Sequence, residues 1–256
     1  MTSSVESILA SAGIENAHRE ARWLLEAARD NEAALELAHR RAAGEPLQYL
    51  TGVAGFRRLE LAVGPGVLIP RPETEVVVER AMAVLPPNGT LVDVGTGSGA
   101  IALAVASERA DARVFATELA GEALAWALKN RSALGLDVDL LHGNLFEPLP
   151  PTLRGAVDVV VSNPPYVAEK ERGSLPRDVV EHEPQLALFA KDGLEVIRRL
   201  VEQSPDWLTP DGWLVLEIGE TQAADVDALF KRHGYRDGFI EQDLTGRERI
   251  AAARRP

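Results

Sequence analysis

The stretch that decides the fold is TLVDVGTGSGAIAL, residues 90–103. Its first residues, 90–94, form a short apolar run that includes one acid, Asp93. A glycine-rich turn follows, and small apolar residues then recur with the period of a helix. The order strand, glycine turn, helix is typical of a nucleotide-type cofactor site at the first strand of a doubly wound α/β sheet.

The spacing of the glycines narrows the kind of ligand. Gly95, Gly97 and Gly99 follow the pattern Gly-x-Gly-x-Gly rather than Gly-x-Gly-x-x-Gly, which counts against a dinucleotide and favours an adenosyl ligand without a pyrophosphate. Glu118 ends the next apolar run, about 20 residues on, where an acceptor for ribose hydroxyls is expected. The alternative for Glu118 is a solvated charge at the end of a strand.

A second motif, VDVVVSNPPYV at residues 157–167, predicts a buried parallel strand that ends in a rigid turn. Because proline lacks an N–H and restricts the residue before it, Asn163 is held extended, and the carbonyls of Asn163 and Pro164 stay out of any helix. The Asn163 side-chain oxygen and the Pro164 backbone oxygen can each accept one N–H of a planar NH2 group, with the Tyr166 ring over its flat face. The alternative is an ordinary Pro-Pro turn with a capping asparagine.

The composition sets limits on partners and location. The chain has 256 residues, 46% of them hydrophobic and 26% charged, which suits one large domain or a medium domain with a small companion. Its net charge of −12 disfavours direct binding of nucleic acid, because a basic face is needed to hold phosphates. The absence of cysteine excludes disulfides and thiolate metal sites, and no apolar run is long enough to span a membrane. We therefore predict a cytoplasmic monomer without a metal or a membrane partner.

The order of the predicted elements divides the chain into three parts. Residues 3–43 have a helical pattern, and we expect a small helical bundle at residues 1–52. Residues 53–72 contain alternating apolar side chains around Gly64-Pro65-Gly66, which predicts a linker β-hairpin with its turn at these three residues. Residues 73–256 alternate strands and helices and end in another hairpin. The predicted fold class is α/β, with a Rossmann-like, mostly parallel sheet, a C-terminal β-hairpin and a small N-terminal helical domain.

The glycine turn and the Asn163–Tyr166 tetrapeptide, in this order, resemble the class I S-adenosylmethionine-dependent methyltransferases whose acceptor is an sp2 amino nitrogen. The tetrapeptide occurs in N6-adenine DNA methyltransferases, some RNA guanine methyltransferases and protein-glutamine N5 methyltransferases. Further motifs separate these families, namely GEPLQYLTGVAGF at 44–56, LIPRPETE at 68–75, EPQLAL at 183–188 and EIG at 217–219. With these motifs the chain resembles the release factor glutamine methyltransferases (the HemK/PrmC family) from about residue 17 to the C-terminus.

The resemblance implies roles for particular residues, with Asn163 and Pro164 as the catalytic pair. The residues implied in binding the substrate glutamine, or in lying at the mouth of its site, are Asn163, Pro164, Pro165, Tyr166, Arg71 and Glu73. The residues implied in binding S-adenosylmethionine are Asp93, Gly95, Thr96, Gly97, Ser98, Gly99, Glu118, Asn144, Leu145 and Asn163. Two residues depart from the family pattern, because Asn144 stands where an aspartate is expected and Leu145 where some members have an aromatic residue.

The implied function is methylation of the side-chain amide nitrogen (N5) of the glutamine in the Gly-Gly-Gln motif of class I peptide chain release factors. S-adenosylmethionine would be the methyl donor and S-adenosylhomocysteine the product. The alternative is an N6-adenine or guanine amino methyltransferase that acts on DNA or RNA, which the net charge of −12 disfavours. A third hypothesis is a non-catalytic protein that retains the fold, and a fourth is a nicotinamide dehydrogenase. The intact tetrapeptide argues against the third, and the glycine spacing against the fourth.

Overall fold

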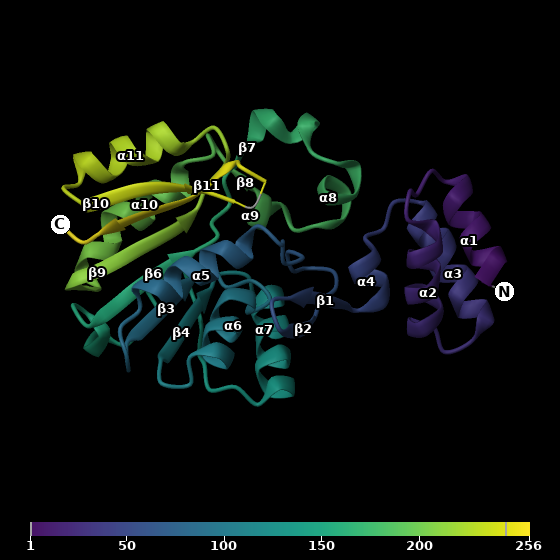
Figure 1. The fold of residues 1–256 in the computed structure, drawn as a ribbon, viewed down its shortest axis with the longest axis horizontal. Helices are drawn as coiled ribbons and strands as arrows, with labels where there is room; N and C mark the ends of the chain where they lie inside the picture. Colours follow the sequence, from purple (N-terminus) through teal and green to yellow (C-terminus); the bar gives the residue numbers. More distant parts are fainter. Residues whose placement is uncertain (1, 244) are drawn as a thin grey trace.

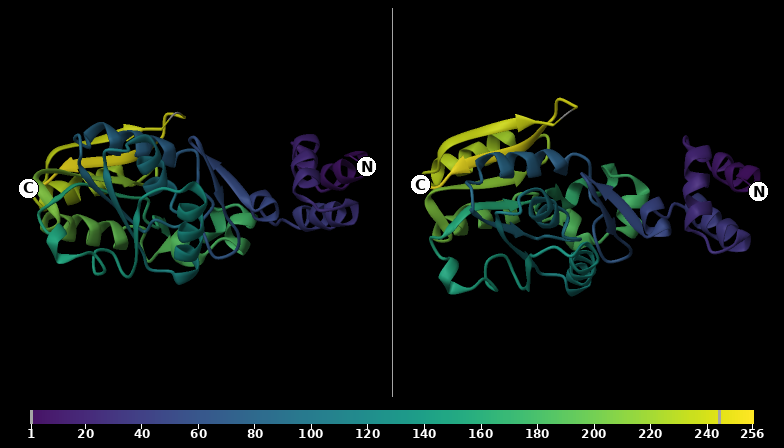
Figure 2. Two further views of the ribbon diagram at one scale, coloured as in Figure 1. Left: turned by 90° about the horizontal axis from the view of Figure 1, so that it is seen from below. Right: turned by 60° about the horizontal axis from the view of Figure 1, so that its bottom comes forward.

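The computed structural model describes residues 2–243 and 245–256. Its N-terminal part is a bundle of three helices that stands apart from a larger α/β body, as the views in Figures 1 and 2 agree. The bundle consists of α1 (Thr2–Ser11), α2 (Ala17–Ala27) and α3 (Asn31–Ala42). Its small core is formed by alanine and leucine side chains about one helical turn apart, among them Ala17, Ala21 and Leu24. A short helix, α4 (Leu47–Thr51), leads from the bundle to the body.

The linker hairpin differs from the prediction. Strands β1 (Val53–Phe56) and β2 (Leu59–Ala62) pair antiparallel around a turn at Arg57 and Arg58. The prediction of a turn at Gly64-Pro65-Gly66 was therefore wrong, although a hairpin does lie within residues 53–72.

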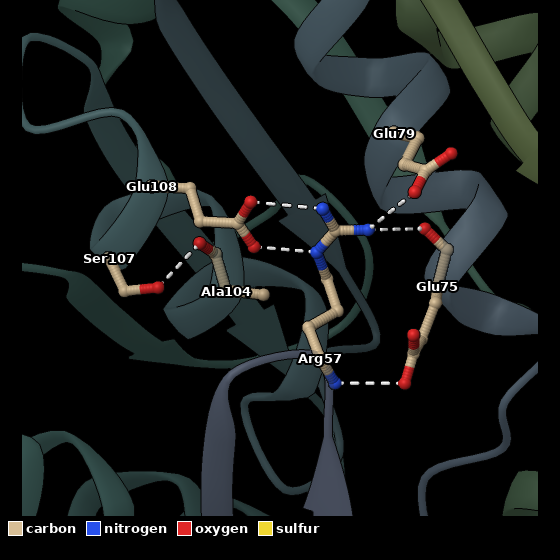
Figure 3. Close-up of polar contacts among 6 residues, drawn as sticks. All are labelled: Arg57, Glu75, Glu79, Ala104, Ser107 and Glu108. Carbon is tan, nitrogen blue, oxygen red and sulfur yellow. Dashed lines mark hydrogen bonds and ion pairs between the residues drawn. The ribbon is translucent and has the colours of Figure 1, made fainter.

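Tertiary contacts of Arg57 explain the position of this turn (Figure 3). Arg57 has a φ of 52°, a left-handed conformation that is uncommon for a residue with a Cβ. Its backbone N–H donates to Glu75 Oε1 at 2.8 Å, and its guanidinium donates two hydrogen bonds to the Glu108 carboxylate, at 2.6 and 2.9 Å. The hairpin is thereby fixed to α5 (Thr74–Val84) and α6 (Ala100–Glu108). Local periodicity carries no information on such distant partners.

The Gly64-Pro65-Gly66 segment packs against α7 (Gly121–Leu134) instead of forming a turn between strands. A Cβ at Gly64 would lie 2.6 Å from a ring carbon of Trp126. The indole N–H of Trp126 donates to the Pro65 carbonyl at 3.2 Å. At Gly64 the missing side chain therefore permits a close approach between two chain segments.

The body is built on a seven-stranded sheet with the order β10-β11-β9-β6-β3-β4-β5. The pairings from β9 to β5 are parallel, and β10 and β11 form an antiparallel C-terminal hairpin at one edge. The predicted fold class is thus confirmed. The strands are β3 (Thr90–Val94), β4 (Arg113–Glu118), β5 (Asp139–His142), β6 (Val157–Ser162), β9 (Leu208–Glu217), β10 (Arg236–Gln242) and β11 (Glu248–Arg254).

Helices cover both faces of this sheet, and the side chains of β6 show why. Val159 and Val161 belong to the core beneath α5 and α6, whereas Val160 belongs to the core beneath two helices that follow later in the chain. Alternate residues of a strand point to opposite faces, so a strand covered on both sides is apolar throughout. The remaining helices of these layers are α10 (Glu195–Gln203) and α11 (Ala223–Arg232). No helix among the described residues has both the length and the apolar character needed to cross a membrane.

Between β6 and α10 the chain leaves the sheet and forms several short elements. They are β7 (Val167–Ala168), α8 (Arg177–His182), α9 (Gln185–Leu188), β8 (Phe189–Ala190) and a 3₁₀ turn at Glu169–Ser174; two further 3₁₀ turns lie at Pro151–Leu153 and Ser204–Asp206. β7 and β8 pair with each other, and the segment containing α8 lies on the side of the body that faces the helical bundle (Figure 1).

The strand order places a topological switch point at β3. The chain runs from β3 to β4 and β5 on one side of it, and then returns to β6 on its other side. In open α/β sheets the carboxyl ends of the strands at such a point border a crevice that binds ligands.

Candidate functional site

A cavity of about 340 Å³ opens at the carboxyl ends of β3, β4, β5 and β6. Loops that follow these strands form much of its wall, as a topological switch point predicts. Small-molecule sites typically have volumes of roughly 300–1,000 Å³. The residues named from the sequence that line this cavity are Arg71, Gly95, Thr96, Gly97, Ser98, Glu118, Asn144, Leu145, Asn163, Pro164 and Pro165.

Four residues named from the sequence do not line the cavity. They are Glu73, Asp93, Gly99 and Tyr166. Glu73 immediately precedes α5. Asp93 and Gly99 support the glycine turn from behind, and the Tyr166 side chain packs against the hydrophobic core, as the contacts below show.

The glycine turn leaves open space at two of its three glycines. Gly95 and Gly97 have φ angles of 76° and 58°, and a Cβ at either position would meet no atom within 4 Å. Gly99 differs, because a Cβ there would lie 2.8 Å from Leu103 Cδ1. The first two glycines thus border the cavity with bare backbone, while the third allows the turn to pack closely on α6.

Asp93 anchors the turn from beneath. Its carboxyl group is fully buried, and Oδ2 accepts hydrogen bonds from Thr96 Oγ1 at 2.6 Å and from the Ala102 backbone N–H at 3.2 Å. Its Oδ1 has no hydrogen-bond partner among the described residues. Burial raises the pKa of Asp93 to about 7, despite the hydrogen bonds that favour its charged form. Asp93 therefore joins the turn to the start of α6 without contact with the cavity.

Glu118 ends β4 with its carboxylate on the wall of the cavity. One oxygen accepts from the Gly97 N–H at 2.9 Å, and the other accepts from the Ala120 N–H at 2.8 Å. Each carboxylate oxygen can accept a second hydrogen bond. The group is thus held in one orientation and can still accept from two neighbouring hydroxyls, such as those of a ribose.

The loop after β5 supplies Asn144 and Leu145 to the opposite part of the wall. Asn144 Nδ2 donates to Glu147 Oε1 at 3.2 Å. Leu145 has a φ of 48°, and such left-handed backbone in a residue with a large side chain is found preferentially at functional sites. The side chain of Leu145 also packs against the core beneath α10.

Asn163 presents a free acceptor to the cavity. Its Nδ2 donates to Thr74 Oγ1 at 3.1 Å, and Thr74 Oγ1 lies 2.6 Å from Glu217 Oε2. Tyr166 is turned away from the cavity, and its hydroxyl donates to Glu217 Oε1 at 3.2 Å. No donor within residues 2–243 and 245–256 reaches Asn163 Oδ1 or the carbonyl of Pro164. Two unused acceptors, adjacent in sequence, are what a planar NH2 group requires.

Arg71, which lines the cavity, forms an ion pair with the buried Glu183. Glu183 also accepts from the Ile69 backbone N–H at 3.3 Å. Burial raises the pKa of Glu183, although Arg71 opposes this shift. The pair holds the segment before α9 against the linker, next to Leu186, whose side chain lines the cavity although it is 56% exposed.

The sequence had not identified all of these residues. It gave no role to Thr74 or Glu217, and the additional lining residues include Leu119, Leu186, Lys191, Val196 and Arg199. Thr74 and Glu217 lie in motifs that had been quoted, but their contact joins residues 143 positions apart. Only the packing of α5 against the end of β9 brings them together.

Comparison with known proteins defines the class and then the family. The model of the methyltransferase small domain matches residues 73–188. A methyltransferase from Pyrococcus furiosus has the same fold, with a TM-score of 0.58 and 21% identity over 77% of this chain and 88% of that one. The likeness to this structure shows a shared fold, and the residues that the family model matches include the strands from β3 to β6.

Curated relatives give the particular family. The release factor glutamine methyltransferase of Geobacter sulfurreducens is 39% identical over 96% of this chain and 92% of its own length. That of Streptomyces coelicolor is 46% identical over 86% of this chain and 79% of its own length. The chain belongs to the release factor glutamine methyltransferase family.

Proposed function

We propose that this protein transfers a methyl group from S-adenosylmethionine to the side-chain amide nitrogen (N5) of the glutamine in the Gly-Gly-Gln motif of class I peptide chain release factors. The observation that carries the proposal is the pair of unused acceptors, Asn163 Oδ1 and the Pro164 carbonyl, on residues that line the cavity. The names of the relatives support the same acceptor. The proposed partner is therefore a release factor. The alternative, methylation of an amino group in DNA or RNA, is tested by the experiment below.

The residues around the cavity fit S-adenosylmethionine. Open space at Gly95 and Gly97 lets a ligand contact the backbone, and Glu118 can accept both ribose hydroxyls. Asn144 and Leu145 also line the cavity, and we assign the adenine to them. S-adenosylmethionine supplies an electrophilic methyl group on a sulfonium sulfur.

The chain's own groups address the weakness of the amide as a nucleophile. The lone pair of an amide nitrogen is delocalised into its carbonyl, and positive charge develops on the nitrogen during transfer. Acceptors fixed on both N–H groups stabilise that charge and orient the nitrogen for in-line attack. Tyr166 is unsuited to act as the base, because burial and the neighbouring Glu217 raise its pKa further above the normal value. In this mechanism the proton leaves to water after transfer.

The acceptor is tested with S-adenosylmethionine labelled in its methyl group. The substrates are purified release factor, the same factor with Gln→Ala in its Gly-Gly-Gln motif, duplex DNA and tRNA. We expect label on the native factor and none on the other three. Label on nucleic acid alone would establish the alternative, and the absence of label on every substrate would contradict a catalytic role.

The cofactor site is tested by calorimetry with Gly97→Val. The valine side chain would enter the open space next to the glycine turn, so we expect binding of S-adenosylmethionine to be lost. Gly13→Val is the matched control, since Gly13 also has a positive φ, of 79°, and open space around its Cβ, but lies between α1 and α2. Unchanged affinity of Gly97→Val would contradict the assigned site.

A further inference from the structure

A buried chain of hydrogen bonds connects Asn163 to Glu217. Thr74 is the first residue of α5 and is 4% exposed, and Glu217 is the last residue of β9 and is 1% exposed. The chain runs from Asn163 Nδ2 to Thr74 Oγ1, at 3.1 Å, and on to Glu217 Oε2, at 2.6 Å. Three segments that are distant in sequence therefore meet at the cavity, where Asn163 and Thr74 form part of the wall and Glu217 lies outside it.

The chemistry of these groups gives the chain a direction. Burial raises the pKa of Glu217 to about 7, so above that pH the group is ionised. An ionised carboxylate can only accept hydrogen bonds, and a hydroxyl has one proton to donate. Thr74 uses that proton on Glu217, so it can only accept from Asn163. The atom of Asn163 next to Thr74 must then be Nδ2, and Oδ1 is left on the other side of the amide, unpaired among the described residues. Tyr166 donates to the second oxygen of Glu217 and so occupies it.

The charged groups nearby leave this arrangement undisturbed. The guanidinium of Arg249 lies 5.9 Å from the centre of the Tyr166 ring, with its Nε 3.6 Å from Asp243 Oδ2. Arg71 is paired with Glu183. Within the described part of the chain Glu217 forms no ion pair, and the two hydroxyls are its side-chain partners. A buried carboxyl group without a counter-ion costs stability, which calls for a reason beyond packing.

We propose that Thr74 and Glu217 are positioning residues that fix the Asn163 amide with its oxygen toward the substrate. The site then offers acceptors alone at this point, and it selects an NH2-bearing glutamine over a glutamate carboxylate. The identity of the substrate in this statement follows from the proposed function. The direction of the hydrogen bonds in the free protein does not depend on it.

The kinetic test compares two substitutions of one residue. Thr74→Val keeps the shape and removes the hydroxyl, while Thr74→Ser keeps the hydroxyl. For Thr74→Val we expect kcat with release factor to fall roughly 10- to 100-fold. This is a smaller effect than the roughly 10²- to 10³-fold typical when a hydrogen-bonding group that acts in the transition state is removed, because the Asn163 amide itself remains. The affinity for S-adenosylmethionine should be retained. Thr74→Ser should restore most of the rate. Thr90→Val, at another buried threonine outside the cavity wall, should match the wild type.

A release factor with Gln→Glu in its Gly-Gly-Gln motif gives a second readout. It should compete poorly with the native factor in the wild type, because two acceptors face its carboxylate. In Thr74→Val the freed amide can turn its NH2 toward the cavity, so competition should strengthen several-fold. Equal turnover of the valine and serine variants, high or low, would overturn the proposal, as would unchanged competition. Thr74→Ala also lacks the hydroxyl and replaces the valine variant if that protein does not fold.

A nuclear magnetic resonance measurement on the free protein separates this proposal from the proposed function. The side-chain NH2 signals of Asn163 are identified by their loss in Asn163→Ala. In the wild type and in Thr74→Ser they should exchange slowly with solvent, and in Thr74→Val they should shift and exchange faster. Unchanged signals in Thr74→Val would overturn the positioning role even if methylation is observed. The expected shift would support that role even if the substrate were a different amine.

Discussion

Two polar clusters, one around Arg57 and one around Glu217, both join segments that are far apart in sequence, but they balance charge differently. Arg57 donates to Glu75, Glu79 and Glu108, so its positive charge meets carboxylates on α5 and α6 (Figure 3). Glu217 meets two hydroxyls and, among the described residues, no cation at ion-pair distance.

The difference shows in the direction of the pKa shifts. The hydrogen bonds from Arg57 lower the pKa of Glu108, whereas burial raises the pKa of Glu217 to about 7. The Arg57 cluster lies outside the cavity and fixes the hairpin to the body. The Glu217 cluster touches Asn163, which lines the cavity. Charge balance thus distinguishes a cluster that stabilises the fold from one that orients a group in the site.

The largest effect is expected where the Glu217 cluster reaches the cavity. Asn163→Ala removes an acceptor that is needed mainly in the transition state, which typically costs ~2.7–4 kcal/mol, so turnover should fall roughly 10²–10³-fold. The affinity for S-adenosylmethionine should change little, and kinetics together with calorimetry measure the two quantities. An equal loss of cofactor affinity would mean that Asn163 serves the cofactor rather than the acceptor amide.

The second effect is the pH dependence of stability. As pH rises, the contribution of the Glu217 cluster to the free energy of unfolding should fall and that of the Arg57 cluster should rise. Between the usual pKa of 4.5 and about 7, folded Glu217 holds a proton that the unfolded chain has lost, so the free energy of unfolding falls as pH rises through this window. Glu217→Gln removes this loss, which amounts to roughly 3 kcal/mol above pH 7.

Glu108→Gln is the matched variant in the Arg57 cluster. The lowered pKa of Glu108 means that its contribution is present above its unfolded pKa and is lost as pH falls toward the folded value. Denaturation with urea from pH 4 to pH 8 should therefore show that Glu217→Gln gains stability at high pH and that Glu108→Gln loses it there. Parallel changes in the two variants would remove the distinction between the clusters.

The third effect concerns Arg57 itself. Arg57→Met keeps most of the side-chain length but removes the donor to the Glu108 and Glu79 carboxylates and to the Glu75 backbone carbonyl. We expect a loss of about 2 kcal/mol, reduced from the fully buried case because the cluster is partly exposed. Arg57→Lys should recover only part of it, since an ammonium cannot bind a carboxylate in the bidentate geometry. Binding of S-adenosylmethionine should persist in both variants. Its loss would place the hairpin anchor within the functional site.

Local signals in the sequence were enough to predict the sheet and part of the site. Residues 159–161 are apolar because β6 is covered on both faces. The glycine turn and the Asn163 turn follow from backbone chemistry within a few residues. The same signals placed Gly95, Gly97 and Glu118 together, because neighbouring parallel strands end at the same edge. Their roles toward a ligand stay predictions until the cofactor test is made.

Long-range contacts account for what the sequence did not predict. The turn at Arg57 depends on Glu108, 51 positions away, and alternation of apolar residues fits a hairpin turn in either place. Thr74 was quoted only within the motif at 68–75, and its contact with Glu217 arises only when α5 packs against β9. Tyr166 was expected over the substrate amide, but its hydroxyl is bound to Glu217.

The smallest effect should come from an exposed ion pair of similar geometry, Lys231 and Asp227 on α11. Lys231 Nζ lies 2.5 Å from Asp227 Oδ2, but the two side chains are 75% and 39% exposed. Water screens such pairs, and i,i+4 pairs on helices contribute about 0.3–0.5 kcal/mol, so Lys231→Ala should lower the free energy of unfolding by no more than that. The same urea experiment measures it, with 1 M salt as a check, since salt should abolish the difference. If Lys231→Ala instead lowers the free energy of unfolding as much as Arg57→Met does, short distance rather than burial sets the strength of these ion pairs. The contrast between the Arg57 and Glu217 clusters would then need an explanation other than burial and charge balance.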